Sequence, residues 1–223
     1  MLQCRYLKSE TGFNQDVWDE MVALGWTGLT IPEQFGGFAM GIGATVPLVE
    51  SMGRHMLCTP YISATIAAQA IVRGGSESQQ SKWLPAMVKG TIGTLALLDN
   101  EDWGATSTSC ELTTKDDQLE LKGKKLLVHD ALVSDFFLVL AKYEGTEVLV
   151  IVESSQLADN AIDSKTLVDE TKRAANVDFT GVTIQSDAIL PSGEAALADL
   201  RLIGALLIAS EATGSAAAAL DTV

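Results

Sequence analysis

Histidine and cysteine side chains are the first residues to test for metal-binding or nucleophilic chemistry. His55 and His129 stand far apart in the chain, and neither belongs to a metal-binding spacing such as HExxH. Cys4, Cys58 and Cys110 form no CxxC pair, and their odd number makes a poor disulfide framework. We therefore expect no metal site, and we interpret the cysteines as reduced, buried thiols.

Serines and glycines give no sign of acyl-enzyme chemistry or of a phosphate-binding loop. Ser63, Ser107 and Ser109 lack the GxSxG setting of a nucleophilic serine. The glycines form neither the GxGxxG pattern of a dinucleotide-binding fold nor the GxxxxGK pattern of a P-loop. The acidic run at 99–102 is of the kind that usually forms a solvated loop.

The overall charge argues against a nucleic-acid partner. Fifteen Lys and Arg are set against 29 Asp and Glu, a formal net charge of −14 at pH 7, so no broad basic surface can neutralise phosphates. A hydrophobic content of 47% excludes intrinsic disorder. Because Met1 is not followed by an apolar signal region, we expect a cytoplasmic protein.

Apolar periodicity divides the chain into helix, strand and helix regions, at 1–91, 92–191 and 192–223. The first region predicts a helix capped by Asn14 and closed at Gly25, and a second over 42–52, ended by Gly53. A third runs from 60 to 74. Ser76 and Gln79 form a capping box for a fourth, which Pro85 ends or kinks.

The middle region alternates as strands do and predicts a small barrel or sandwich of six or seven short strands. The fold class is therefore α+β, with an N-terminal helical domain, a central small β-barrel and the start of a C-terminal helical bundle. The expected strands lie at 92–98, 109–114, 118–122, 124–128, 136–141 and 146–152, with a bulged strand or strand pair over 177–184.

The last helix is apolar on more than one side, as its seven leucines and isoleucines between 197 and 208 indicate. Charged residues such as Asp199, Arg201 and Glu211 interrupt it, so a buried bundle helix is favoured over a membrane span. Such a helix needs cover on several sides. We expect either other chains or a longer gene product to supply that cover, and we favour the second.

Three segments in order resemble the N-terminal domain of acyl-CoA dehydrogenases. They are WDEMVALGWTGLTIPEQFGG at 18–37, ESMGRHMLCTP at 50–60 and GSESQQSKWLPAMVKG at 75–90. A DxTRAAxVxxxGVxV-like segment at 169–182, here DETKRAANVDFTGV, and a GRKxxVxxG-like strand at 123–131 are similar to a divergent branch of the family, which includes subunits acting on steroid side chains and other bulky acyl-CoAs.

This resemblance implies an oxidoreductase that uses FAD. In the family a glutamate removes the α proton of an acyl-CoA while the β hydrogen leaves as hydride to the flavin, and the cofactor performs the redox step. An electron-transfer flavoprotein or a similar acceptor then takes the electrons. The resemblance also implies an oligomer, formed by copies of one chain or by different subunits.

The family's flavin-contacting strand, GQKMWITNG, corresponds to GKKLLVHDA at 123–131. Leu127 replaces the tryptophan that lies along the flavin ring, and His129 replaces the hydroxyl residue that hydrogen-bonds it. The alternative is that His129 has a structural or surface role, as most histidines at the end of a strand do. The family loop that precedes this strand, TEPGAGSD, is matched loosely by Leu97 to Ser107. Asp99 or Glu101 lies near its glutamate position, and Thr106 or Ser107 is the candidate for its serine. The set of cofactor-binding residues that the resemblance implies is Leu97, Thr106, Ser107, Leu127, Val128 and His129.

No catalytic base is found in the chain. The early position that a few family members use aligns with Gly204, and Arg201 to Leu206 contains no glutamate. The common late position would lie beyond Val223, and we expect Glu211 to form a helix-surface or inter-helix pair. Two functions stay open: an acyl-CoA dehydrogenase chain, or a non-catalytic subunit of a heteromeric acyl-CoA dehydrogenase, which the changes at Leu127 and His129 motivate.

Overall fold

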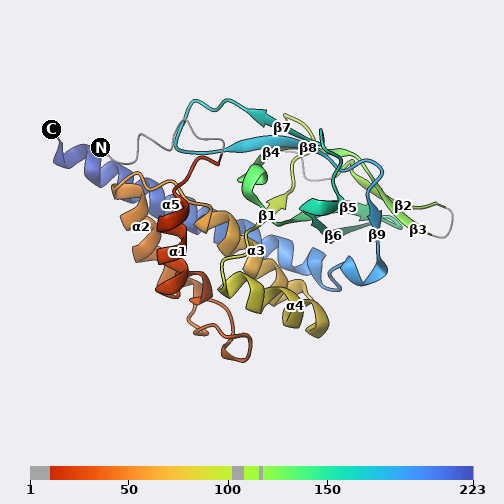
Figure 1. Cartoon of the computed structure of the whole chain (residues 1–223), viewed down its shortest axis with the longest axis horizontal. Coiled ribbons are helices and arrows are strands. Elements are labelled where there is room, and N and C mark those ends of the chain that lie inside the picture. Colours follow the sequence, from red (N-terminus) through yellow and green to blue (C-terminus); the bar gives the residue numbers. More distant parts are fainter. Residues whose placement is uncertain (1–10, 102–107, 116–117, 223) are drawn as a thin grey trace.

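The computed structural model describes residues 11–101, 108–115 and 118–222. These residues form five α-helices: α1 (Gln15–Ala23), α2 (Val46–Arg54), α3 (Tyr61–Gly74), α4 (Glu77–Val88) and α5 (Gly193–Asp221). They also form nine strands: β1 (Gly93–Ala96), β2 (Glu111–Lys115), β3 (Gln118–Lys122), β4 (Lys124–His129), β5 (Phe136–Tyr143), β6 (Thr146–Glu153), β7 (Ile162–Lys165), β8 (Ala174–Asp178) and β9 (Thr183–Ile184). Figure 1 shows the helices, α5 among them, on one side of the strands.

Local sequence signals set most helix ends. The Asn14 side chain accepts a hydrogen bond from the Asp16 N–H at 3.0 Å, and Ser76 and Gln79 form the predicted capping box. The second helix differs from its prediction at both ends. It begins with a 3₁₀ turn, so that α2 starts at Val46, and it continues past Gly53 to Arg54. Pro85 does not end α4, which continues to Val88, and the alternative of a kink at Pro85 stays a prediction.

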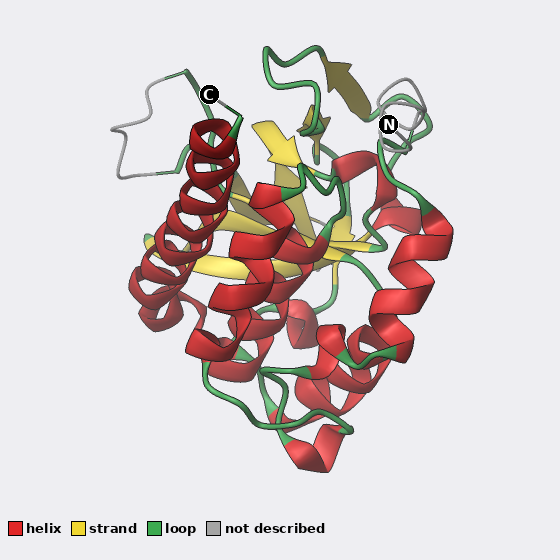
Figure 2. Cartoon of the chain, turned by 90° about the vertical axis from the view of Figure 1, so that its left-hand side faces the viewer, coloured by secondary structure: helices red, strands yellow, loops and turns green. Residues whose placement is uncertain are grey.

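Helix α5 packs along α2 and α3, in the layer of helices that faces the viewer in Figure 2. One of its sides is buried by this packing. Its opposite side leaves Leu202 and Leu220 exposed, with Leu202 at 70%. Within the described chain the helix therefore lacks the cover on several sides that its composition predicts. Of the described helices it alone is long and apolar enough to cross a membrane, a test that core helices of soluble proteins also pass.

The strands form two sheets rather than a closed barrel. One has six strands in the order β1-β5-β2-β3-β9, with β6 also pairing β5, and the other has three in the order β4-β8-β7. Phe137, Val139 and Val150 of the first sheet share a buried core with Val128 and Val177 of the second. The described strands thus make a sandwich of open sheets, and the barrel of the sequence prediction is not present.

The chain passes from the first sheet to the second at Gly123, between β3 and β4. Gly123 has φ of +145°, and a Cβ there would lie 2.9 Å from the Cα of Cys110. The hydrogen-bond ladder breaks at this corner, because β3 pairs with β9 in the first sheet whereas β4 pairs with β8 in the second.

The predicted domain boundaries fall between α4 and β1 and just before α5. They stay predictions. Helix α5, which they assign to a separate C-terminal unit, contacts α2 and α3 of the first unit over much of its length.

Candidate functional site

A cavity of about 1030 Å³ lies where α3 and α5 meet the ends of β1 and β4. This is at the upper end of the volumes of small-molecule sites. Its apolar lining residues are Phe13, Ile62, Ile66, Leu95, Leu97, Leu98, Leu126, Leu127, Leu200, Ala205 and Ile208. Its polar lining residues include Thr59, Ser63, Thr94, His129, Asp130, Asp169, Lys172, Arg173, Arg201 and Glu211. The cavity can therefore hold a large apolar group together with a polar one.

A β-bulge in β4 shapes one wall of this cavity. Lys125 pairs with Val177 of β8, and Val128 pairs with Ala175, so Leu126 and Leu127 both lie opposite the single residue Asn176. Leu127 takes up the extra length with φ of +49°, and its N–H donates to Asn176 Oδ1 at 3.1 Å. As a result two successive leucines line the cavity, where a regular strand would turn one of them inward.

Three of the residues predicted to bind the cofactor meet at this wall. Leu97, Leu127 and His129 line the cavity, and the hydroxyl of Thr94 in β1 donates to the His129 carbonyl at 2.7 Å. Val128 points to the opposite side, into the core between the sheets, and is 1% exposed. Thr106 and Ser107 lie outside the described residues. The cofactor assignment of all six stays a prediction.

Asp130 and Ser63 form a polar contact that the sequence did not single out. Asp130 follows β4 in a left-handed conformation, with φ of +53°, and its carboxylate accepts a hydrogen bond from Ser63 Oγ of α3 at 2.6 Å. Burial raises the pKa of Asp130 above its ordinary 3.8, and the Ser63 hydrogen bond opposes this rise. The 67 residues between the two positions leave no local signal for the contact.

The raised pKa of Asp130 predicts how Asp130→Asn changes stability with pH. A raised native pKa means that the folded state holds its proton more tightly, so the native protein loses stability as pH rises above 3.8 through the native pKa. Asparagine tolerates the left-handed conformation and can still accept from Ser63. We expect Asp130→Asn to be more stable than the unaltered protein in urea unfolding at pH 7, and to lose this advantage toward pH 3.8.

Asp169→Asn is the matched control, with the opposite sign. Burial raises the pKa of Asp169, but hydrogen bonds from the Thr171 side chain and N–H outweigh it and leave that pKa below 3.8. Its ionised form therefore stabilises the fold above 3.8, and the variant should lose stability at pH 7. An Asp130→Asn protein that is less stable at pH 7 would contradict the assignment.

Helix α5 supplies the opposite wall with Leu200, Gly204, Ile208 and Glu211, which share one helix face. Gly204 lies at the wall, so the position aligned with the family's early base faces the cavity without a carboxylate. Glu211 forms an ion pair with Lys172, in the loop between β7 and β8. Glu211 is therefore paired, but its partner lies in a loop of the strand region and not on another helix as one of the two expected alternatives had it.

Two more polar groups of the lining lie before α3. The hydroxyl of Thr59 is buried and has no hydrogen-bond partner among the described residues, so an occupant of the cavity can use it. Burial raises the pKa of the half-buried Cys58 thiol, which keeps it protonated and a weak nucleophile. Within the described ranges, no three His, Cys, Asp or Glu side chains gather as around a metal ion.

Asp99 corrects the expectation of a solvated acidic loop at 99–102. Its side chain is 4% exposed and forms an ion pair with Lys125 of β4, which is 0% exposed. A buried lysine attracts a buried carboxylate because neither charge can be left unpaired in the interior. The two positions are 26 residues apart, so the acidic run alone could not reveal this partner.

The chain is similar to acyl-CoA dehydrogenases over its helical and sheet regions. Residues 3–91 match the family model "Acyl-CoA dehydrogenase, N-terminal domain". Mitochondrial isovaleryl-CoA dehydrogenase of Bos taurus is 30% identical over 139 residues, 60% of this chain and 33% of that protein. An acyl-CoA dehydrogenase of Mycobacterium tuberculosis, FadE12, is 23% identical over 199 residues, 83% of this chain and 50% of that protein.

Solved structures agree with these sequence relatives. The steroid ACAD Tcur3481–Tcur3483 is 26% identical, with a TM-score of 0.84, over 99% of this chain and 59% of that chain. The ChsE4–ChsE5 complex from Mycobacterium tuberculosis has the same fold, with a TM-score of 0.75 and 22% identity over 92% of this chain and 54% of that chain. The chain thus spans between a third and three fifths of the length of these relatives. Its first 91 residues thus contain a match to the N-terminal domain of acyl-CoA dehydrogenases, and the chain as a whole is similar to members of that family.

Proposed function

We propose that this chain is part of a flavin-dependent enzyme that dehydrogenates the α,β bond of an acyl-CoA thioester. The observation that carries the proposal is the cavity between α3, α5 and the bulged strand β4. It combines an apolar wall with hydrogen-bonding groups, and it is lined by three of the residues that the family resemblance assigns to flavin contact. The likeness to a steroid ACAD favours a bulky acyl group as substrate.

The residues present fit FAD at the β4 wall. Leu97 and Leu127 offer an apolar surface along which a flat ring can lie, and the imidazole of His129 can hydrogen-bond its polar edge. The unpartnered Thr59 hydroxyl offers a further hydrogen bond inside the cavity. FAD, when bound, accepts the hydride, while these side chains bind and orient it and keep water away from it.

The proton acceptor is proposed to come from outside these 223 residues. Three described carboxylates line the cavity, and each one is already bound by a neighbour. Glu211 is paired with Lys172, Asp130 accepts from Ser63, and Asp169 accepts from the N–H and hydroxyl of Thr171. Gly204 leaves space at the wall where the family's early base would stand. A base brought to this space by another part of the protein, or by another subunit, would reach an acyl chain lying in the cavity.

A non-catalytic subunit of a heteromeric dehydrogenase is the second candidate. It is favoured by Leu127 and His129, which replace the aromatic and hydroxyl side chains of the family's flavin strand. It is also supported by a relative of the same fold that forms a complex of two different chains, ChsE4 and ChsE5. In that case the chain would stabilise a catalytic partner. A homo-oligomer that turns over acyl-CoA by itself would exclude this alternative.

The test is to purify the protein that the intact gene encodes, with any subunit that co-purifies, and to record its flavin absorbance. Addition of acyl-CoA thioesters of increasing bulk should bleach the flavin and reduce an artificial electron acceptor. Colourless protein without turnover would refute the dehydrogenase proposal. Flavin that appears only together with a second subunit would favour the heteromeric candidate.

We also propose an electron-transfer flavoprotein or a similar acceptor as partner. The proposal is supported by a solved structure of the same fold, described as an electron transferring flavoprotein of Acidaminococcus fermentans. We further propose an oligomeric enzyme located in the cytoplasm. The free thiols of Cys58 and Cys110 support a reducing compartment.

Filling the cavity from α5 should block ligand binding. A Cβ at Gly204 would meet one atom within 4 Å, Ile66 Cδ1 at 3.7 Å, so Gly204→Phe projects its ring into the space that we assign to the acyl chain. We expect acyl-CoA affinity, measured by calorimetry, to fall at least about tenfold. Leu202→Phe on the exposed side of α5 is the control, and equal loss of affinity in both variants would contradict the assignment.

A further inference from the structure

A fully buried lysine lies directly behind the cavity wall. Lys125 is the second residue of β4 and is 0% exposed. Its ammonium donates to the Leu97 carbonyl at 3.2 Å, to Thr108 Oγ1 at 2.8 Å and to the carboxylate of Asp99. Because an ammonium has three N–H donors, these contacts satisfy all of them.

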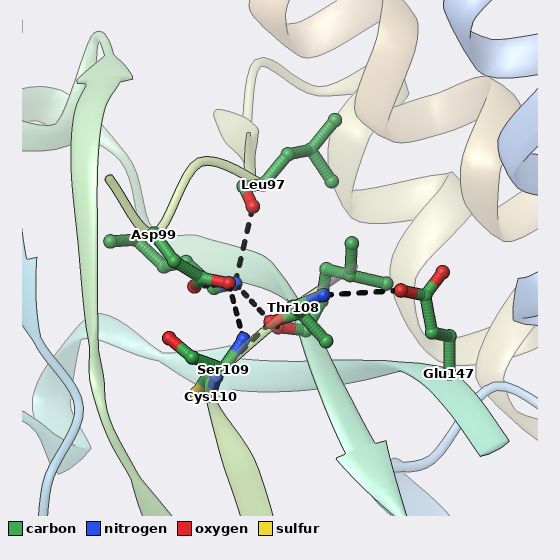
Figure 3. A network of polar contacts seen from close by, with 8 residues as sticks. Leu97, Asp99, Thr108, Ser109, Cys110 and Glu147 are labelled. Atoms are coloured by element: carbon green, nitrogen blue, oxygen red, sulfur yellow. Dashed lines mark hydrogen bonds and ion pairs between the residues drawn. The ribbon is translucent and has the colours of Figure 1, made fainter. Parts of the chain in front are cut away.

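The partners of Lys125 are held from other sides as well, as Figure 3 shows. The second carboxylate oxygen of Asp99 accepts from the Ser109 N–H at 2.6 Å, and Thr108 Oγ1 donates to the Leu140 carbonyl at 3.2 Å. The Thr108 N–H donates to Glu147 Oε1 at 3.2 Å. The network therefore connects the end of β1 and the start of β2 to β4, β5 and β6.

The same backbone segments present their other side to the cavity. Leu97 follows β1 and lines the cavity, while its carbonyl is bound to Lys125. Leu126, the next residue after Lys125, lines the cavity too, and its N–H donates to the Leu98 carbonyl at 2.7 Å. Lys125 is also the last paired residue before the bulge, and two residues beyond it Leu127 adopts its left-handed conformation.

An ion pair in the interior is a costly way to gain stability, because apolar side chains of similar volume are often as stabilising. What it adds is direction, since each hydrogen bond fixes where a partner must lie. We propose that the Lys125–Asp99 ion pair is a positioning device, which holds the end of β1 against the bulge of β4 and thereby sets the cavity wall formed by Leu97, Leu126 and Leu127. This inference rests on the proposed function in one respect, that the wall faces the flavin.

The decisive variant is the apolar replacement of both partners, Lys125→Met with Asp99→Leu. We expect its Tm to stay within about 5 °C of the unaltered protein. The amide N–H groups of Leu126 and Leu127 should nevertheless exchange with solvent at least about tenfold faster, because the wall has lost its anchor. Flavin should bind about tenfold more weakly to the protein purified from its gene.

Lys124→Met is the matched control. Lys124 precedes Lys125 in the same strand, but its side chain is 68% exposed and its ion pair with Asp178 lies at the surface. It should change neither exchange nor flavin binding. If the double variant does not fold, Asp99→Asn removes the charge with little change of volume and is measured in the same two ways.

The outcomes separate this inference from the proposed function. A double variant with normal Tm and normal exchange at Leu126 and Leu127 would overturn the positioning role, because the pair would then be merely structural. Normal exchange with weakened flavin binding would overturn it too. Unaltered protein that holds no flavin would refute the proposed function, and the exchange measurement would still decide the role of Lys125.

Discussion

Lys125→Met is expected to lower the free energy of unfolding by about 3–5 kcal/mol, the usual cost of removing one partner of a buried ion pair. Methionine fills much of the volume of the lysine side chain, so the loss comes from the carboxylate of Asp99. That side chain is 4% exposed and would lose its positively charged partner in the interior. It would retain the Ser109 N–H as a donor, which cannot replace a full positive charge. Urea unfolding at pH 7 measures the change.

Lys124→Met provides the comparison for this stability measurement. Its ion pair with Asp178 is solvent-exposed, with an N–O distance of 3.0 Å, and pairs of this kind contribute at most about 1 kcal/mol. The two variants make the same substitution at neighbouring positions of one strand. If both changed the free energy of unfolding by similar amounts, burial of the Lys125–Asp99 pair would not have the consequence that we assign to it.

Short-range signals in the sequence predicted the parts of the fold that depend on short-range interactions. The Asn14 cap and the Ser76–Gln79 capping box satisfy N–H groups within three residues, so the residues that form them appear together in the chain. The strings at 18–37, 50–60 and 75–90 carried the resemblance to the family and so the expected order of helices and strands. Leu97, Leu127 and His129 were named from the strand at 123–131 and the loop at 97–107, and they lie together at one wall.

Contacts between distant residues could not be predicted in the same way. Asp99 looked like part of a solvated acidic loop because nothing near it reveals Lys125, and Ser63 carries no mark of its contact with Asp130. Strand β7 was not among the predicted strands. Its sequence, IDSK, has no alternating apolar residues, and two of its four side chains are exposed. The bulge in β4 also escaped notice, because it depends on the register with β8.

Gly53 is required by the packing of two helices and not by the end of a helix. It was predicted as the residue that ends the second helix, but α2 continues to Arg54. A Cβ at Gly53 would lie 2.0 Å from the carbonyl oxygen of Glu211 in α5. The glycine is therefore explained by the close approach of another helix, and the helix that approaches begins some 140 residues later in the sequence.

Gly214→Ala is expected to lower the free energy of unfolding by about 3 kcal/mol, the upper end of the usual range for overpacking. A Cβ at Gly214 of α5 would lie 1.8 Å from the carbonyl oxygen of Glu50 and 2.8 Å from the backbone nitrogen of Arg54, both in α2. Backbone atoms cannot rotate away as a side chain can, so the two helices must separate. Separation would also weaken the hydrogen bond from Ser215 Oγ to the Gly53 carbonyl, at 3.1 Å.

Gly204→Ala is the internal control for that prediction, because it makes the same substitution in the same helix. Its Cβ would lie at ordinary contact distance, 3.7 Å, from Ile66 Cδ1. Alanine is favoured over glycine inside a helix by about 1 kcal/mol, so this variant should unfold at equal or higher urea concentration. The opposite signs of the two changes would place the close α2–α5 contact at Gly214. Equal stability of the two variants would mean that α5 can move away from α2 without loss, and that α2 does not fix the helix that forms one wall of the cavity.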